Sequence, residues 1–187
     1  MDLDLADRVY IVTGGTRGLG RATADVLVAE GARVVVSGRS RESLDSLATA
    51  YGEAAVTVAA DNADADTPGR LMAAARGRWG RLDGALISVG GPPAGQVSAI
   101  EDEQWRAAFE SVFLGGVRLC REIGAALGEG GSLALVLSSS VRQPSSPKTS
   151  RSTSSVTAAI AAGRAPKSSS SSGTPKCTTS PVASRRG

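Results

Sequence analysis

The sequence predicts an α/β protein built on a doubly wound parallel sheet in three α/β/α layers, truncated after a fifth strand. Short apolar runs alternate along the chain with segments whose apolar residues recur at helical spacing. Each apolar run is unbroken, which is typical of strands that are buried on both faces of a sheet. Strands that alternate with helices in this way form a parallel sheet covered by helices, so the fold class follows from these two patterns.

The first half of the expected sheet begins with a strand at 9–12. A glycine-rich turn follows, and then a helix with apolar residues at helical spacing from Leu19 to Leu27, which Gly31 ends. The second strand is expected at 33–36. A second helix, 44–51, ends at Gly52, and the third strand is expected at 56–60.

The second half of the expected sheet begins with a third helix, for which Thr67 is expected as the N-cap and Pro68 as the first-turn proline. The fourth strand is expected at 85–88. The longest helix runs from about 101 to 127 and carries one apolar stripe that includes Trp105 and Val112. The fifth strand is expected at 133–137, and because no sixth strand is recognisable, we expect its outer edge to be exposed.

Composition divides the chain of 187 residues in two near Gln143. Residues 1–143 hold all 18 acidic residues against 14 arginines, a net charge of −4, whereas the remaining 44 residues carry seven basic residues and no acid. This second part, 144–187, is rich in Ser, Thr, Pro and Ala and contains no Leu. Such a composition buries too little apolar surface to offset chain entropy, so we expect one globular domain, 1–143, followed by a disordered Ser/Pro/basic tail.

Several function classes are not expected from this composition. The chain has no histidine, and Cys120 and Cys177 form no metal-ligand or disulfide pattern, so neither a metal site nor a Ser/His/Asp triad is expected. The tail has no aromatic residue to stack on bases, and nucleic acid is not an expected partner. No apolar run reaches the roughly 18 residues of a membrane helix, and the acidic start is unlike a secretory signal, so we expect a cytoplasmic protein.

The glycine-rich turn after the first strand, TGGTRGLG at 13–20, is the first candidate functional site. Ligands of parallel α/β sheets bind beyond the carboxyl ends of the strands. Glycines at positions 14, 18 and 20 allow a sharp turn and a close backbone approach to a pyrophosphate, and the N-terminus of the following helix offers unpaired N–H groups to that anion. The turn therefore indicates a nucleotide-binding site.

The spacing Gly14-x-x-x-Gly18-x-Gly20 resembles the short-chain dehydrogenase/reductase family rather than the Gly-x-Gly-x-x-Gly dehydrogenases. Further likenesses are Asp61 after the third strand, SVGG from Ser88 where the family usually has Asn-Ala-Gly, and LALVLSSS as the strand that leads to the catalytic serine. The resemblance covers roughly 5–142 and implies a Rossmann-like fold. It also implies cofactor contacts from Gly14, Thr16, Arg17, Gly18, Leu19, Gly20, Arg39, Asp61, Asn62, Ser88 and Gly90.

The charge after the second strand favours NADP(H) over NAD(H). Members that prefer NAD(H) place an acid there to bind the ribose 2′-hydroxyl, whereas this chain has Ser37, Gly38 and Arg39. Arg39 and Arg17 are both able to hold a 2′-phosphate through paired guanidinium donors.

The resemblance implies hydride transfer between NADP(H) and a small carbonyl or alcohol substrate, and self-association through the long helix. Ser139, or next Ser140, matches the family's catalytic serine, but Val112 stands where the family has a proton-relaying asparagine. No Tyr-x-x-x-Lys follows the serines or occurs anywhere in the sequence, so we expect no catalysis from the chain as written. Three explanations remain open: a reading-frame shift near Gln143, a non-catalytic dinucleotide-binding protein such as a pseudoenzyme or sensor, and a tail that acts as an interaction arm.

Overall fold

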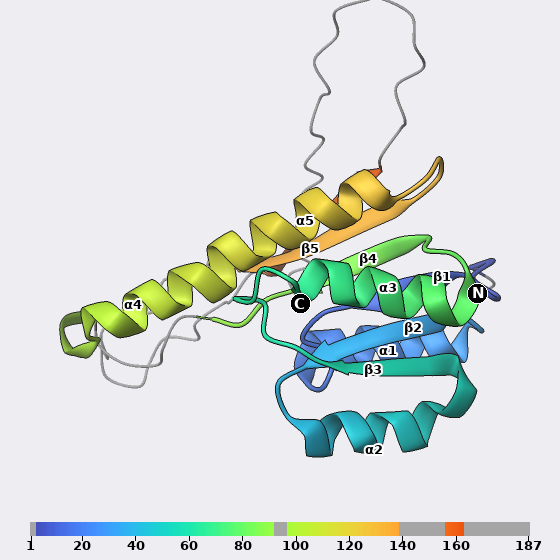
Figure 1. Ribbon diagram of the computed structural model, residues 1–187, viewed down its shortest axis with the longest axis horizontal. Helices are drawn as coiled ribbons and strands as arrows, with labels where there is room; N and C mark the ends of the chain where they lie inside the picture. The colour runs from blue at the N-terminus through green and yellow to red at the C-terminus, as the bar shows by residue number, and fades with distance from the viewer. Residues whose placement is uncertain (1–2, 92–96, 139–155, 163–187) are drawn as a thin grey trace, which may run out of the picture.

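The fold is a single sheet in the order β3-β2-β1-β4-β5-β6, with helices on both faces (Figure 1). It is described by a computed structural model, which covers residues 3–91, 97–138 and 156–162. Strands β1 to β5 pair in parallel throughout. The predicted doubly wound α/β fold is therefore confirmed.

The elements lie close to their expected ranges, with strand ends shifted by a residue or two. In chain order they are β1 (Val9–Val12), α1 (Gly18–Ala29), β2 (Arg33–Gly38), α2 (Arg41–Tyr51), η1 (Gly52–Ala54), β3 (Ala55–Ala59), α3 (Thr67–Trp79), β4 (Gly84–Ser88), η2 (Val97–Ala99), α4 (Asp102–Ala108), η3 (Phe109–Leu114), α5 (Gly115–Ala126), β5 (Ser132–Ser138) and β6 (Val156–Ala162).

Two details of the helices differ from expectation. The expected N-cap role of Thr67 is wrong: Thr67 is the first residue of α3 and Asp66 is the cap, because the Thr67 hydroxyl donates to the carbonyl oxygen of Asp61 at 2.6 Å instead. The expected long helix at 101–127 is continuous in space, but its middle, η3, is a π-helix between α4 and α5. In Figure 1 the α4 end of this helix reaches well past the ends of the strands.

The outer edge of β5 is paired, so the expectation of an exposed edge is wrong. Strand β6 runs antiparallel to β5, with Leu133 opposite Ala161 and Leu137 opposite Thr157. This strand lies within 144–187, the range whose composition predicts disorder, and the rest of that range lies outside the described residues. Alanine has a low strand propensity, and β6, VTAAIAA, is mostly alanine, which is why no strand is recognisable there from the residues alone.

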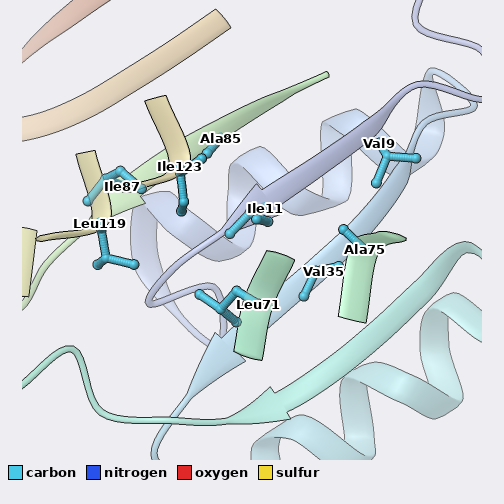
Figure 2. Close-up of a cluster of buried hydrophobic side chains, with 9 residues drawn as sticks. All are labelled: Val9, Ile11, Val35, Leu71, Ala75, Ala85, Ile87, Leu119 and Ile123. Carbon is cyan, nitrogen blue, oxygen red and sulfur yellow. The ribbon is translucent and has the colours of Figure 1, made fainter. Parts of the chain in front are cut away.

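The sheet is buried on both faces by two apolar clusters. On one face Leu71 and Ala75 of α3 and Leu119 and Ile123 of α5 pack on β1, β2 and β4 (Figure 2). On the other face residues of α1 and α2, among them Leu44 and Leu47, pack on the same central strands. The clusters explain the unbroken apolar runs, because side chains of β1 and β2 point into both of them.

The chain order places a reversal of direction beside β1. From β1 the sheet grows outward through β2 to β3, and the chain then returns to pair β4 with the other edge of β1. In open α/β sheets the crevice at such a reversal, beyond the carboxyl ends of the strands, is where ligands bind.

Candidate cofactor-binding site

The turn between β1 and α1 is shaped by glycines in close contact with backbone atoms. Gly14 has φ +59°, and a Cβ there would lie 2.7 Å from the carbonyl oxygen of Ser88. A Cβ on Gly20 would lie 2.5 Å from the carbonyl oxygen of Gly14. Any side chain at either position would push the first turn of α1 away from the strand ends, so the sequence TGGTRGLG fixes how closely the helix N-terminus approaches the crevice.

A reciprocal hydrogen-bond pair joins this turn to the end of β4. The hydroxyl of Thr13 donates to the carbonyl oxygen of Ser88 at 3.0 Å and accepts from the Ser88 N–H at 2.9 Å. Thr13 is fully buried. Its side chain therefore fixes the two strands on either side of the crevice relative to each other.

A cavity of about 410 Å³ lies at this crevice, within the roughly 300–1,000 Å³ that is typical of ligand sites. It brings together the sequence-predicted residues Gly14, Thr16, Arg17, Gly18, Arg39, Asp61, Asn62, Ser88 and Gly90. Two predicted residues do not line it. Gly20 is buried beneath the turn, and the side chain of Leu19 is 53% exposed at the start of α1.

The cavity is also lined by residues that were not predicted from the sequence. These are Ser37 and Gly38 at the end of β2, Ala60, Val89, Gly91 and, from the long helix, Ser111. All of these except Ser111 lie close in sequence to predicted site residues at the ends of β2, β3 and β4. Their place beside a strand end is the signal that identifies them. Ser111 gave no such signal, because it lies in the π-helix, where the rotation per residue differs from that of an α-helix.

The cavity is lined by both positively and negatively charged side chains. The Arg39 guanidinium is 77% exposed and its Nη1 lies 3.9 Å from a carboxylate oxygen of Asp61, and Arg17 lines the same cavity. Such an exposed ion pair contributes little to stability, about 0–1 kcal/mol. Arg39 is therefore able to exchange Asp61 for an incoming anion at small cost.

The candidate catalytic residues do not complete a reaction centre in the described part of the chain. Ser139 and Ser140 lie outside the described residues. Tyr10 and Tyr51 are the only tyrosines in the sequence, and neither lines the cavity. Burial raises the pKa of Tyr10, and burial together with a hydrogen bond to Asp25 raises the pKa of Tyr51 to about 12, whereas a tyrosine that exchanges protons near neutral pH needs a lowered pKa.

A second cavity, of about 400 Å³, lies at the opposite, amino-terminal edge of the sheet. Arg33, Arg78 and Arg81 line it, but each is paired with a carboxylate, from Asp7, Glu53 and Asp83 respectively. Because these charges cancel and the helix N-terminus of α1 lies at the other edge, this cavity does not fit an anionic cofactor.

The described residues offer neither a metal site nor a membrane-spanning helix. In that part of the chain no three His, Cys, Asp or Glu residues converge to hold a metal ion. None of the helices described is long and apolar enough to cross a membrane.

Comparison with known proteins agrees with this geometry. The family model for short chain dehydrogenases matches residues 8–159. This chain belongs to the short-chain dehydrogenase family. Members of the family are oxidoreductases that bind NAD(P) and act on small alcohol or carbonyl compounds.

Three similar proteins illustrate the match to the short-chain dehydrogenases. An uncharacterized oxidoreductase of Mycobacterium tuberculosis is 35% identical over 141 residues, 73% of this chain and 51% of that protein. The structure of a short-chain dehydrogenase/reductase, glucose/ribitol dehydrogenase, from Brucella melitensis has a TM-score of 0.66 and 31% identity over 71% of this chain and 55% of that one. L-Sorbose reductase from Gluconobacter frateurii, complexed with NADPH and L-sorbose, has a TM-score of 0.60 and 25% identity over 67% of this chain and 51% of that one. The chain thus spans about half the length of these relatives.

Proposed function

We propose that residues 1–143 form a dinucleotide-binding domain whose site is the cavity at the carboxyl ends of the strands. The observation that carries this proposal is the meeting of the glycine turn, the β4 end and two arginines in that one cavity. Because Gly14 and Gly20 have no side chain, the turn packs closely against the end of β4 and keeps the N-terminus of α1 beside the cavity, where its N–H groups can meet a pyrophosphate. In an active enzyme of this family, the bound dinucleotide would supply a hydride for the reduction of a carbonyl carbon or accept one from an alcohol.

NADP(H) is the cofactor that we propose, with NAD(H) as the less favoured alternative. At the end of β2, where preference for NAD(H) would require an acid, the cavity is lined by Ser37 and Arg39. Arg17, which precedes α1, adds a second guanidinium group that is able to bind a phosphate. The NADPH bound to the sorbose reductase similar to this chain also supports the choice.

Titration with NADPH and NADH tests the cofactor assignment. The unmodified protein is expected to bind NADPH more tightly, and Arg39→Asp is expected to cut or reverse that preference by about 1–3 kcal/mol, the range for a charge-assisted hydrogen bond. Arg41→Asp is the matched control, because Arg41 is exposed on the adjacent helix α2 and does not line the cavity. Equal affinities for both cofactors in the unmodified protein would overturn the assignment.

For catalysis we propose that this chain binds cofactor without turning over substrate, although its relatives are oxidoreductases. The support is the sequence, which holds no Tyr-x-x-x-Lys, and the raised pKa of both tyrosines. The chain would then act as a dinucleotide-binding protein without catalysis, such as a sensor or pseudoenzyme, and an NADP(H)-dependent oxidoreductase like its relatives is the competing function. Measuring NADPH binding and NADPH oxidation separately, with a panel of small ketones and aldehydes, distinguishes the two, since only an enzyme shows both.

We also propose that the protein self-associates. Phe109, Phe113 and Val117 are spaced four residues apart on the long helix and are 55%, 56% and 44% exposed. The two phenylalanine rings stack on each other with centroids 5.0 Å apart. An exposed apolar stripe of this kind is typical of an association surface.

A further inference from the structure

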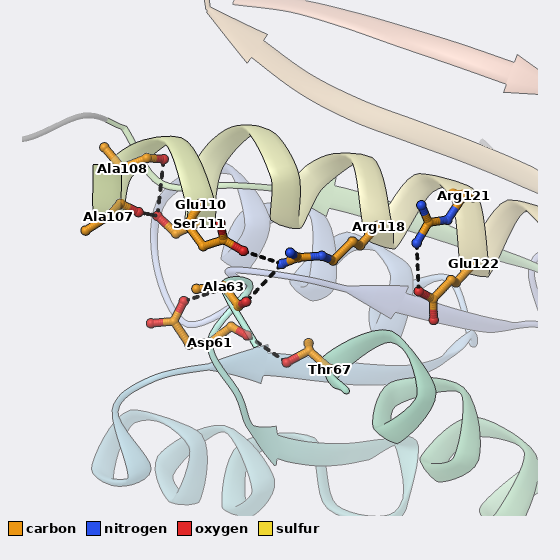
Figure 3. Close-up of polar contacts among 10 residues, drawn as sticks. All are labelled: Asp61, Ala63, Thr67, Ala107, Ala108, Glu110, Ser111, Arg118, Arg121 and Glu122. Atoms are coloured by element: carbon orange, nitrogen blue, oxygen red, sulfur yellow. Dashed lines mark hydrogen bonds and ion pairs between the residues drawn. The ribbon is translucent and has the colours of Figure 1, made fainter. Parts of the chain in front are cut away.

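Arg118 of α5 contacts the turn that forms one wall of the cavity. Its Nη1 lies 2.6 Å from Oε1 of Glu110 and donates to the carbonyl oxygen of Ala63 at 3.1 Å (Figure 3). The Arg118 side chain is only 25% exposed. Because one nitrogen makes both contacts in a partly buried place, the guanidinium is held in one orientation against the backbone of the turn.

The π-helix explains how Glu110 reaches Arg118. The two residues are eight positions apart, and in a regular α-helix they would be separated by about 80° around the axis. In the i→i+5 turns of η3 the chain rotates less per residue, which brings Glu110 closer to the face that carries Arg118. Glu110 balances the charge of Arg118 and fixes its direction.

The turn that Arg118 contacts, Asp61–Ala63, is also held by hydrogen bonds within the segment 61–67. A carboxylate oxygen of Asp61 accepts from the Ala63 N–H at 3.0 Å, and the Asp61 carbonyl accepts from Thr67. Gly115 packs so closely that a Cβ on it would overlap the carbonyl oxygen of Asn62. The long helix therefore supports the turn from behind, while Asp61 and Asn62 line the cavity on the other side.

The wall formed by Asp61 lies beside Arg39, the proposed partner of the 2′-phosphate on the adenosine half of the dinucleotide. We propose that Arg118 is a positioning residue for that adenosine end. It touches no ligand itself but holds the Ala63 carbonyl, and with it the cavity wall formed by Asp61 and Asn62, in the geometry needed for binding. A wall that is ordered before binding lowers the entropy cost of binding, so the loss of this support weakens affinity. This inference rests on the proposed function.

The test compares three variants of the full chain. Arg118→Met keeps the apolar stem and removes the donors, Arg118→Lys restores a single nitrogen that is able to meet both partners, and Arg121→Met is the matched control. Arg121 lies on the same helix but is 67% exposed and pairs with Glu122. The probes are NADPH and adenosine 2′,5′-bisphosphate, which represents the adenosine end alone, and hydrogen exchange reports on the amides of 61–67.

Arg118→Met is expected to weaken both probes by a similar factor of about ten, to speed exchange at 61–67, and to leave the melting temperature close to that of Arg121→Met. Arg118→Lys is expected to recover part of the affinity. Equal affinities in Arg118→Met and Arg121→Met overturn the inference and leave the proposed function standing. Lost affinity with a lowered melting temperature and no recovery in Arg118→Lys also overturns it. If the unmodified protein binds neither probe, the proposed function fails and this inference fails with it.

Discussion

At the scale of single residues, Tyr51 ties together the two helices on one face of the sheet. Its hydroxyl donates to Oδ1 of Asp25 at 2.6 Å, and Nε of Arg21 donates to the same oxygen at 2.9 Å. The Arg21 guanidinium also lies 5.4 Å from the centre of the Tyr51 ring. Asp25 and Arg21 belong to α1, whereas Tyr51 is the last residue of α2. The Tyr51 hydroxyl therefore links the two helices through a hydrogen bond.

Replacing Tyr51 with Phe is expected to lower the free energy of unfolding by about 1 kcal/mol at pH 7, because a hydrogen bond to a charged group is lost. Burial and the bond to Asp25 raise the pKa of Tyr51 from 10.0 to about 12 in the folded state. The raised pKa means that this stabilisation is fully present below pH 10 and is lost as the pH rises through about 12.

Urea unfolding of the unmodified and Tyr51→Phe proteins across pH 7–12 measures the effect. The gap in stability between them is expected to close at the alkaline end. Absorbance titration provides the control, since only Tyr10 remains to ionise in the variant. A gap that stays constant across the range would contradict the assigned hydrogen bond.

At the scale of elements, two of the three glycines of α5 lie in opposite environments. Gly115 faces the carbonyl oxygen of Asn62 without room for a Cβ, whereas no atom lies within 4 Å of a Cβ placed on Gly124. Gly115→Ala is expected to destabilise the protein by about 1–3 kcal/mol through overpacking against backbone. Gly124→Ala is expected to stabilise it by about 0.5–1 kcal/mol, because alanine is the better helix former.

Thermal unfolding of the two alanine variants checks this prediction. Their melting temperatures are expected to move in opposite directions from that of the unmodified protein. Two shifts of the same sign and similar size would show that α5 does not pack against the Asn62 turn as described.

The sequence predicts the elements that have a clear pattern of apolar residues. It does not predict the elements whose structure depends on contacts with the rest of the fold. Apolar runs locate β1 to β4 because side chains of these strands pack into the apolar clusters on both faces of the sheet. They locate β5 because Leu133 and Leu135 pack against one of these clusters. The glycine turn and the strand ends locate most of the cavity, since ligands bind there in any sheet of this topology. The π-helix, which brings Ser111 to the cavity, and β6, which is mostly alanine, have no periodicity that distinguishes them.

At the scale of the whole molecule, the exposed apolar stripe on the long helix is the surface through which we propose that the protein self-associates. Phe113→Glu is expected to shift the protein to a smaller species in size-exclusion chromatography with light scattering, because a charge cannot be buried unpaired in an apolar interface. Val26→Glu is the matched control, as Val26 is 54% exposed but lies on α1. A protein that is monomeric without any substitution would contradict the proposed association.

The pairing of β1 with β4 has a consequence for the order of folding. Strands β1, β2 and β3 meet neighbours that are close in sequence, whereas Thr13 and Ser88, which join the turn to β4, are 75 positions apart. Closing so long a loop costs chain entropy before any contact rewards it, so we expect this step to come late and to limit the folding rate. The cavity has walls from both halves of the sheet, and it therefore does not exist until that step is complete. A nucleotide therefore binds only to chains in which β1 and β4 are already paired. Its binding would stabilise the folded chain against separation of these two strands.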